Sequence, residues 1–368
     1  MFPTDITLVT EFKAVIQYNT FIDLNTDAAV ASAFGIYAKG SVYWQGCDIL
    51  KNYFYSENIA QTIAIFVDPT DIDVPFKINY NRVFHNSIPG AAITFGEGTA
   101  GAMDGTEIIG NLCSGYLKTN EYNEAAATHG ILVNGGKDFI VKYNKIINHA
   151  LGMAFKANAG EQYTSGGIFY NIFYNNSAHF YIRRAGLVPV YGNTFVNADS
   201  ITTQRVGAID DQTGPAGCAR GSVFTNNIFH SNGVSNKLMF AIQDSTLLEG
   251  TDDPDFNDNI WDYDNTIKAI VDSVDSDPTY TYDEAVTNGW INNGEQAHPV
   301  YTDKANGILT LEAGSAGIGD GTDLGAALDD GLDATTDWNE TPDGEVDNFP
   351  TIVTKQQGAT WDKGAYVS

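Results

Sequence analysis

Residues 143–148 read YNKIIN, and this short pattern of an Asn followed by apolar residues recurs along most of the chain. The copies place an Asn, or in the last copy an Asp, at Asn19, Asn52, Asn81, Asn111, Asn144, Asn171, Asn193, Asn226 and Asp258. The steps between these positions vary from 22 to 33 residues. Such variation excludes helical repeats of fixed length but suits a coil whose loops differ in length. We therefore expect each copy to be one turn of a coil, or rung.

Each copy contains a short run of alternating apolar residues rich in β-branched and aromatic types, which is typical of a strand between turns. A strand that cannot bury its apolar face alone gains a core by stacking on the next rung, about 4.8 Å away. The recurring Asn side chains would then form a ladder of amide hydrogen bonds. Together with 37 Gly, 19 Tyr and 20 Phe, the pattern predicts an all-β, single-stranded parallel solenoid of about nine or more rungs.

The pattern extends over about residues 12–245 and is accompanied by the strand-like stretches HGILVNG at 129–135 and LGMAFKAN at 151–158. In these features the chain resembles the right-handed parallel β-helix superfamily, which includes pectate-lyase-like enzymes and phage tailspike-like proteins. The stretches at 309–325 and 361–368 resemble the closing segments of bacterial and phage members. The resemblance implies a right-handed β-helix, but this superfamily hosts many activities, so fold alone does not assign a function.

The chain divides by composition into residues 1–248, expected to form the regular coil, and residues 249–368. From residue 250 onward there are 25 Asp or Glu and four Lys. We expect this acidic part to form the last irregular rungs and a loop-rich cap of the same domain, which protects the final strand edges. No amphipathic helix precedes the first rung, so its edge requires another chain, an upstream domain or the segment 2–9.

The net charge of −27 excludes nucleic acid and anionic membranes as partners, and no apolar run approaches the length of a transmembrane helix. No signal peptide is evident, although a leader is removed from a mature secreted protein, and we expect an extracellular or virion-surface location. Cys47, Cys113 and Cys218 are an odd number at wide spacing, which favours buried free thiols over a disulfide.

A cationic position recurs twelve residues after three successive ladder Asn residues, at Lys156, Arg183 and Arg205. Asn134 takes the same place one rung earlier. Alternation with inward Met153 and Phe155 points Lys156 outward. Residues 137–220 carry a net charge of +3, whereas the rest of the chain carries −30. A cationic stripe on an acidic coil predicts binding of a linear anionic polysaccharide such as a polyuronate.

Cleavage of a uronate polymer by β-elimination requires a base, a cation against the carboxylate and a proton for the leaving oxygen. A lysine acts as a base more readily when a like charge lies one rung away, as Lys156 beside Arg183 would. Several β-helix lyases resemble this pair, and some also use calcium, which the resemblance makes a candidate cofactor. We expect further substrate contacts or proton carriers nearby: His149, His179 and Tyr181.

Other interpretations remain open. Lys156 and Arg183 would be ordinary surface residues if they pair with loop carboxylates such as Glu161 or Asp199, or they bind a glycan without cleaving it.

The acidic residues offer two further candidate sites. Paired Asp210 and Asp211 are candidates for glycoside hydrolysis. The stretch at 253–264 spaces Asp253, Asp255, Asn257 and Asp264 like a calcium loop, but has Asp258 where Gly is needed.

The whole chain also fits a non-enzymatic phage tail or surface-appendage subunit, a monomer or homotrimer, that binds glycans or serves assembly.

Overall fold

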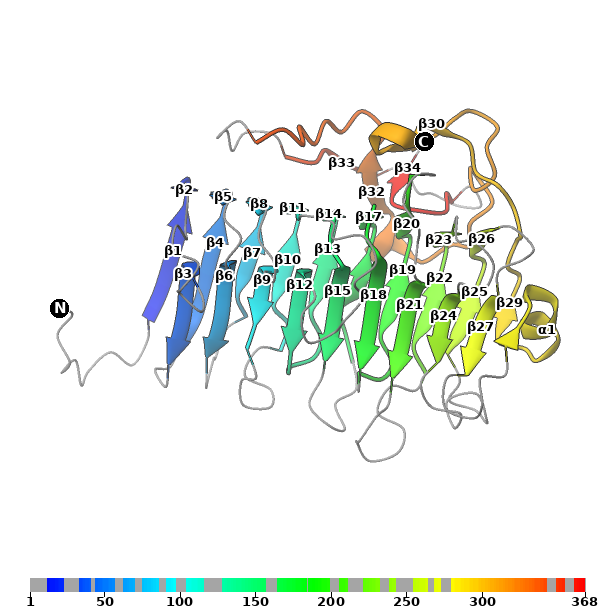
Figure 1. Ribbon diagram of the computed structural model, residues 1–368, viewed down its shortest axis with the longest axis horizontal. Helices are drawn as coiled ribbons and strands as arrows, with labels where there is room; N and C mark the ends of the chain where they lie inside the picture. Colours follow the sequence, from blue (N-terminus) through cyan, green and yellow to red (C-terminus); the bar gives the residue numbers. More distant parts are fainter. Residues whose placement is uncertain are drawn as a thin grey trace.

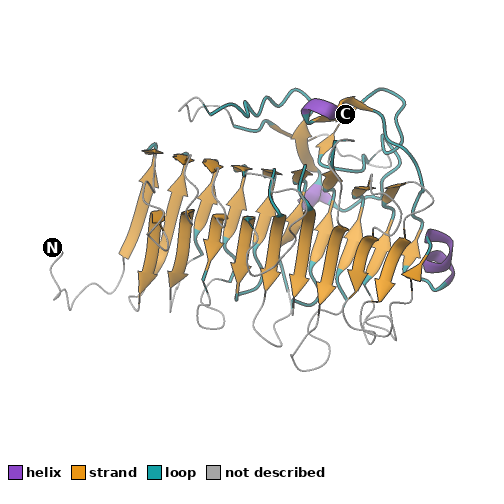
Figure 2. Cartoon of the chain, viewed as in Figure 1, coloured by secondary structure: helices purple, strands orange, loops and turns teal. Residues whose placement is uncertain are grey.

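The computed structural model is a parallel β-solenoid (Figure 1). It describes residues 12–22, 33–40, 44–56, 62–69, 75–85, 91–96, 104–115, 128–156, 164–183, 185–198, 205–210, 221–231, 238–242, 254–263, 268–272, 279–342, 349–354 and 361–367. Strands dominate the described chain, and its helices are short (Figure 2). The prediction of an all-β solenoid of stacked coils is confirmed.

Three long sheets form the sides of the solenoid, and each rung contributes one strand to each sheet. Sheet A contains β1 (Phe12–Gln17), β4 (Trp44–Leu50), β7 (Lys77–Asn79), β10 (Glu107–Ile109), β13 (Ile140–Lys142), β16 (Gly167–Phe169), β19 (Pro189–Tyr191), β22 (Val223–Thr225), β25 (Asp255–Asn257) and β29 (Ile291–Asn292). Sheet B contains β2 (Thr20–Ile22), β5 (Tyr53–Ser56), β8 (Arg82–His85), β11 (Leu112–Ser114), β14 (Lys145–Ile147), β17 (Ile172–Tyr174), β20 (Thr194–Val196), β23 (Ile228–Ser231) and β26 (Ile260–Tyr263). Sheet C contains β3 (Ala33–Gly40), β6 (Thr62–Pro69), β9 (Ala91–Phe95), β12 (His129–Asn134), β15 (Leu151–Lys156), β18 (Ala178–Arg183), β21 (Arg205–Asp210), β24 (Leu238–Ile242), β27 (Lys268–Asp272) and the antiparallel β28 (Thr279–Tyr280).

The predicted Asn ladder lies in the turn between sheets A and B. Asn144 is typical: its backbone N–H and its Nδ2 both donate to Oδ1 of Asn171 at 2.9 Å, and Nδ2 also donates to the backbone oxygen of Ile108. The ladder amides that make the same inter-rung bonds are those of Asn19, Asn52, Asn81, Asn111, Asn144, Asn171, Asn193, Asn227 and Asn259. The amides are thereby satisfied inside an apolar core.

The last two ladder positions differ from the prediction by one residue. Asn227 and Asn259 form the rungs, whereas Asn226 and Asp258 precede them with φ of 57° and 53°. Each turn needs one left-handed residue before the ladder Asn, a conformation that Asn and Asp tolerate better than most residues. Two adjacent polar residues therefore left the assignment ambiguous in the sequence.

The interior is filled by stacked aliphatic and aromatic side chains from all three sheets. Phe173, Phe195 and Phe229 stack on successive rungs, with ring centroids 4.7 and 5.5 Å apart. Cys47 and Cys113 are buried free thiols, as predicted, and burial raises the pKa of Cys47 to about 12 and that of Cys113 further. Cys218 lies outside the described residues.

Regular rungs continue beyond residue 248, through β25, β26, β27 and β29. The antiparallel strand β28 and helix α1 (Tyr282–Thr287) then close this end of the solenoid. Thr281 begins the helix with a capping box formed with Glu284, a common N-terminal arrangement. The end is thus covered by a short segment rather than by the whole acidic part.

The rest of the acidic part, from residue 297, turns back along the outer side of sheet B (Figure 1). We call this returning segment, residues 297–367, the tail. It contains β30 (Tyr301–Asp303), η2 (Lys304–Asn306), β31 (Ile308–Leu311), η3 (Ala326–Leu328), β32 (Asp330–Asp333), β33 (Ile352–Thr354) and β34 (Tyr366–Val367). Its far part reaches the early rungs, where the Phe349 ring packs against Tyr80 and Lys51. The predicted cap is therefore mainly a lateral cover.

At the opposite end, β1, β2 and β3 each pair with only one strand among the described residues. Val15, Tyr18 and Ile22 of this first rung are half exposed or more. The segment 2–9, expected as one candidate cover, lies outside the described residues.

Candidate functional site

Two of the three predicted cations, Lys156 and Arg183, lie at the downstream ends of the sheet C strands β15 and β18. Lys156 is the register partner of Arg183, and Asn134 is the partner of Lys156. Both cations are partly exposed, and Met153 and Phe155 face the main core as expected. The predicted adjacency of Lys156 and Arg183 is therefore confirmed.

Arg205 does not continue this column. It begins β21 and pairs with Ala178, so that Asp210 rather than Arg205 is the register partner of Arg183. The loop before β21 is longer than a constant twelve-residue offset allows, which moved Arg205 to the other end of the strand. The resulting column, which we call the sheet C column, is Asn134, Lys156, Arg183 and Asp210. Asp211, Glu161 and Asp199 lie outside the described residues.

The three predicted accessory residues are buried. His149 and His179 are fully buried and Tyr181 is 1% exposed. His149 Nε2 lies 3.2 Å from the backbone oxygen of Cys113, and burial lowers the pKa of His179 to about 3. Ala154 and Tyr181 belong to a small apolar cluster on the outer face of sheet C. These three side chains are therefore buried and do not present a surface to a polymer.

The stretch that resembles a calcium loop is partly a strand. Asp255 and Asn257 lie in β25, where Asp255 accepts hydrogen bonds from the side chains of Asn257 and Asn292. Asp253 and Asp264 lie outside the described residues. In the described part of the chain, no three His, Cys, Asp or Glu side chains are grouped so that they could hold a metal ion.

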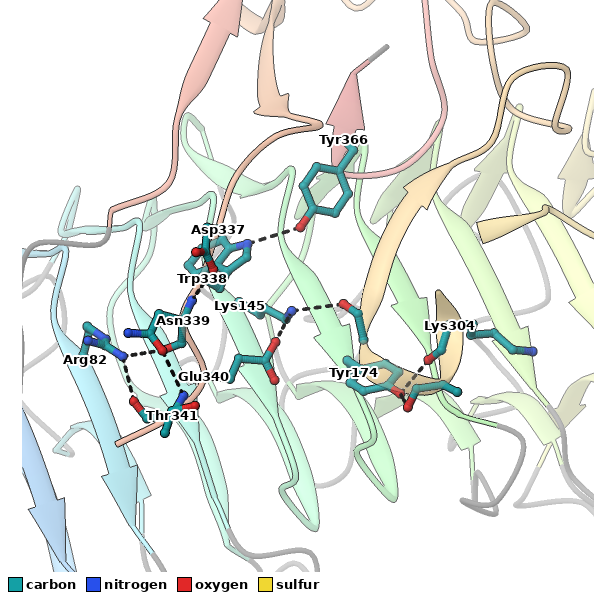
Figure 3. Close-up of polar contacts among 12 residues, drawn as sticks. Arg82, Lys145, Tyr174, Lys304, Asp337, Trp338, Asn339, Glu340, Thr341 and Tyr366 are labelled. Carbon is teal, nitrogen blue, oxygen red and sulfur yellow. Dashed lines mark hydrogen bonds and ion pairs between the residues drawn. The ribbon is translucent and has the colours of Figure 1, made fainter. Parts of the chain in front are cut away.

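A cavity of about 530 Å³ lies between the tail and sheet B. Its floor is Lys145 of β14, and its walls are two tail segments, 306–310 and 334–341, with Tyr366. Trp338 Nε1 donates to the hydroxyl of Tyr366 at 3.2 Å (Figure 3). Burial is the main cause of the raised pKa of Tyr366, so the phenol remains neutral.

Two buried cations hold the 339–341 segment in place. Arg82 is 1% exposed, and its guanidinium donates to the backbone oxygens of Asn339 and Thr341 (Figure 3). Lys145 is 3% exposed; its ammonium pairs with Glu340 and donates to the backbone oxygen of Gly307 at 3.1 Å. The tail is therefore attached at this point by charge-assisted hydrogen bonds, which are stronger than neutral ones.

The role of these two cations is visible in the sequence at the position directly after each ladder Asn. The residue after the ladder Asn starts each sheet B strand, and parallel pairing aligns these residues along the outer side. From β2 to β26 this column, the post-ladder column, reads Thr20, Tyr53, Arg82, Leu112, Lys145, Ile172, Thr194, Ile228 and Ile260. Cations at two places in a column of mostly apolar residues indicate a covering segment that supplies acceptors.

Comparison with known proteins assigns no family: no family model and no curated protein matches the chain. Among the described residues, no helix combines the length and apolar character needed to cross a membrane.

Proposed function

We propose that this protein is an extracellular, carbohydrate-active member of the right-handed β-helix superfamily that binds an acidic polysaccharide along sheet C and cleaves it by β-elimination. The observation that carries the proposal is the pairing of Lys156 with Arg183 on adjacent rungs. Two cations on rungs about 4.8 Å apart, on a chain of net charge −27, form a local positive surface that favours an anionic ligand.

In this proposal Arg183 pairs with the uronate carboxylate, which disperses the charge that develops next to it. Lys156 acts as the base and removes the proton on the carbon α to that carboxylate. The electron pair of the broken C–H bond forms the new C=C bond, and the C–O bond to the leaving sugar breaks. The products are an unsaturated uronate end and a new hydroxyl, and no water is consumed.

The leaving oxygen needs a proton that the buried His149, His179 and Tyr181 are not placed to give. The simplest source is Lys156 itself, which becomes an ammonium after the first transfer and returns the proton on the same face of the sugar. In this proposal Asn134, the register partner of Lys156, binds sugar hydroxyls.

The test is incubation with a panel of uronate polymers, followed by absorbance of the unsaturated product, with calcium added or chelated to reveal a metal requirement. We expect activity on at least one polymer, a fall of at least 100-fold in Lys156→Ala, and a rise in KM and a fall in kcat in Arg183→Ala. Lys77→Ala is the matched control, because Lys77 is an exposed lysine paired with Glu107 on sheet A. Absence of product on every polymer, or full activity in Lys156→Ala, overturns the proposal.

A second candidate is a non-enzymatic subunit of a phage tail or surface appendage. The half-exposed Val15, Tyr18 and Ile22 on the first rung favour it, because its strands pair on one side only among the described residues and exposed apolar side chains at such an edge invite another strand. Light scattering of the intact chain distinguishes the two: a homotrimer at micromolar concentration favours assembly, and a monomer argues against a trimeric spike.

A further inference from the structure

We propose that the cavity between the tail and sheet B is a binding site for a neutral saccharide, separate from the sheet C column. Its volume of about 530 Å³ lies within the range of small-molecule sites, roughly 300–1,000 Å³. This inference does not depend on the lyase proposal, because the two sites lie on different sheets and share no residue.

The cavity wall is preorganised. Arg82 donates to the backbone oxygens of residues 339 and 341, and Lys145 pairs with the carboxylate of Glu340 between them. A shift of this segment would therefore leave two buried cations without these acceptors. Asn339 adopts a φ of 36°, which Asn tolerates better than most residues, and its backbone N–H donates to Oδ1 of Asp337 at 2.9 Å. A rigid wall lowers the entropic cost of binding a small ligand.

The lining carries the groups that sugars require. Glu340 uses Oε1 for Lys145, and Asp337 uses Oδ1 to accept from the backbone N–H of Asn339 at 2.9 Å. Within the described residues the second oxygen of each carboxylate has no other contact and is available to accept from ring hydroxyls. The lining side chains with hydroxyl or amide groups are Asn306, Thr310, Thr335, Thr336, Asn339, Thr341 and Tyr366.

Apolar surface is also present, mainly at Ile308, which is 48% exposed, and to a small extent at Trp338, which lines the wall but is 5% exposed. A sugar ring has one apolar face and an edge of hydroxyls, which this mixture of an indole, an aliphatic side chain and carboxylates matches. A purely apolar ligand would leave the second oxygen of each carboxylate without a hydrogen-bond donor, at a cost in free energy.

Charge decides between neutral and acidic sugars. The cavity is lined by one cation and two carboxylates, Lys145, Glu340 and Asp337, and Lys145 is already paired with Glu340. A uronate carboxylate here would face Asp337 with no cation left to neutralise it, and like charges repel at short range. The site therefore selects uncharged saccharides, in contrast with the sheet C column.

The experiment titrates the full chain with D-glucose, D-galactose, D-mannose and N-acetyl-D-glucosamine. Binding is measured by saturation-transfer NMR and calorimetry, and D-glucuronate is the charged counterpart. Ala334→Tyr fills the cavity from its wall, and Ala334→Ser is its matched control. Asp337→Asn is the second variant: Asp337 is exposed, and the Asn oxygen can still accept from residue 339. Circular dichroism and the unfolding midpoint establish that each variant is folded.

We expect saturable binding of at least one neutral sugar, at least ten-fold weaker binding in Ala334→Tyr and in Asp337→Asn, and unchanged binding in Ala334→Ser. D-glucuronate should bind at least ten-fold more weakly than the neutral sugar. Lys156→Ala should bind the sugar normally, and Ala334→Tyr should retain any uronate cleavage, so that failure of one proposal is distinguishable from failure of the other. The inference is overturned if no neutral sugar binds, if Ala334→Tyr binds as well as the natural chain, or if D-glucuronate binds equally well.

Discussion

The ladder column and the post-ladder column are one residue apart in the sequence, yet they differ in almost every respect. The ladder repeats one residue type, and each Asn side chain bonds to the next inside the core. The post-ladder column faces outward and changes from apolar to cationic at Arg82 and Lys145, where the tail crosses it. In a solenoid, uniform columns serve stacking, whereas departures from uniformity mark contacts with something outside the coil.

The sheet C column is a third case, because its four members are all different: Asn134, Lys156, Arg183 and Asp210. It satisfies no repeated hydrogen-bond pattern like that of the ladder. By the same reasoning it is the column that departs most from uniformity, and we expect substitutions in it to affect function more than stability.

The largest effect is expected from breaking the ladder at its centre. Asn144→Ala removes the acceptor for the N–H and side chain of Asn111 and the donor to Ile108. Each buried group left unpaired costs about 1–3 kcal/mol, so we expect a loss of about 3–5 kcal/mol in the free energy of unfolding, measured by denaturant titration. The control is Asn292→Ala, an exposed Asn bonded to Asp255, with an expected loss below about 1 kcal/mol. Equal losses in the two variants would contradict a structural ladder.

The next effect is expected from the post-ladder column. Lys145→Met retains the apolar stem but leaves Glu340 in a partly buried site without its cation, and loss of one partner of a buried pair typically costs about 3 kcal/mol. We expect a loss of about 2–4 kcal/mol and faster hydrogen exchange in the 334–341 segment.

Lys77→Met is the matched control, because its ion pair with Glu107 is exposed and should contribute less than about 1 kcal/mol. The double variant Lys145→Met/Glu340→Gln should recover part of the loss. If hydrogen exchange at 334–341 is unchanged, the cations do not hold the tail.

These differences also explain how much the sequence could predict. The fold followed from the repeated Asn, because a uniform column is visible in one dimension, and the adjacency of Lys156 and Arg183 followed from counting along equal rungs. The prediction that Arg205 continues this column was wrong, because the loop before its strand has a different length. The cavity was not predictable in the same way, since it depends on where the tail crosses sheet B, and only Arg82 and Lys145 signal that crossing.

The buried histidines predict a pH dependence of stability. Burial lowers the pKa of His85 to about 4 and that of His179 to about 3, below the value of about 6.5 in the unfolded chain. Between these values the unfolded state binds more protons, so stability is fully present above pH 6.5 and falls as the pH decreases. From pH 8 to pH 5 each residue should remove roughly 2 kcal/mol.

Denaturant titrations at pH 8 and pH 5 measure this difference in the free energy of unfolding. His85→Phe should reduce the difference by roughly 2 kcal/mol, because Phe cannot be protonated. Phe should be tolerated here, since neither ring nitrogen of His85 has a hydrogen bond that it would lose. His298→Gln, at a histidine whose side chain is 76% exposed, is the control and should leave the steep decrease in place. If the difference between pH 8 and pH 5 is the same in His85→Phe as in the natural chain, His85 does not cause the pH dependence.

The smallest effect on stability is expected at the sheet C column. Lys156 and Arg183 are partly exposed neighbours of like charge, and surface charges contribute about 0–1 kcal/mol. Lys156→Ala and Arg183→Ala should therefore change the free energy of unfolding by less than about 1 kcal/mol, while they abolish or strongly reduce uronate cleavage. Lys156→Arg retains the positive charge but replaces the amine with a guanidinium, which does not readily give up its proton. Binding without cleavage is the expected result. Asn144→Ala should lower stability without a specific effect on catalysis. Comparing the loss of unfolding free energy with the loss of cleavage in each variant therefore separates a column that stacks rungs from a column that binds a ligand. A loss above about 2 kcal/mol in Lys156→Ala would place this lysine with the ladder instead.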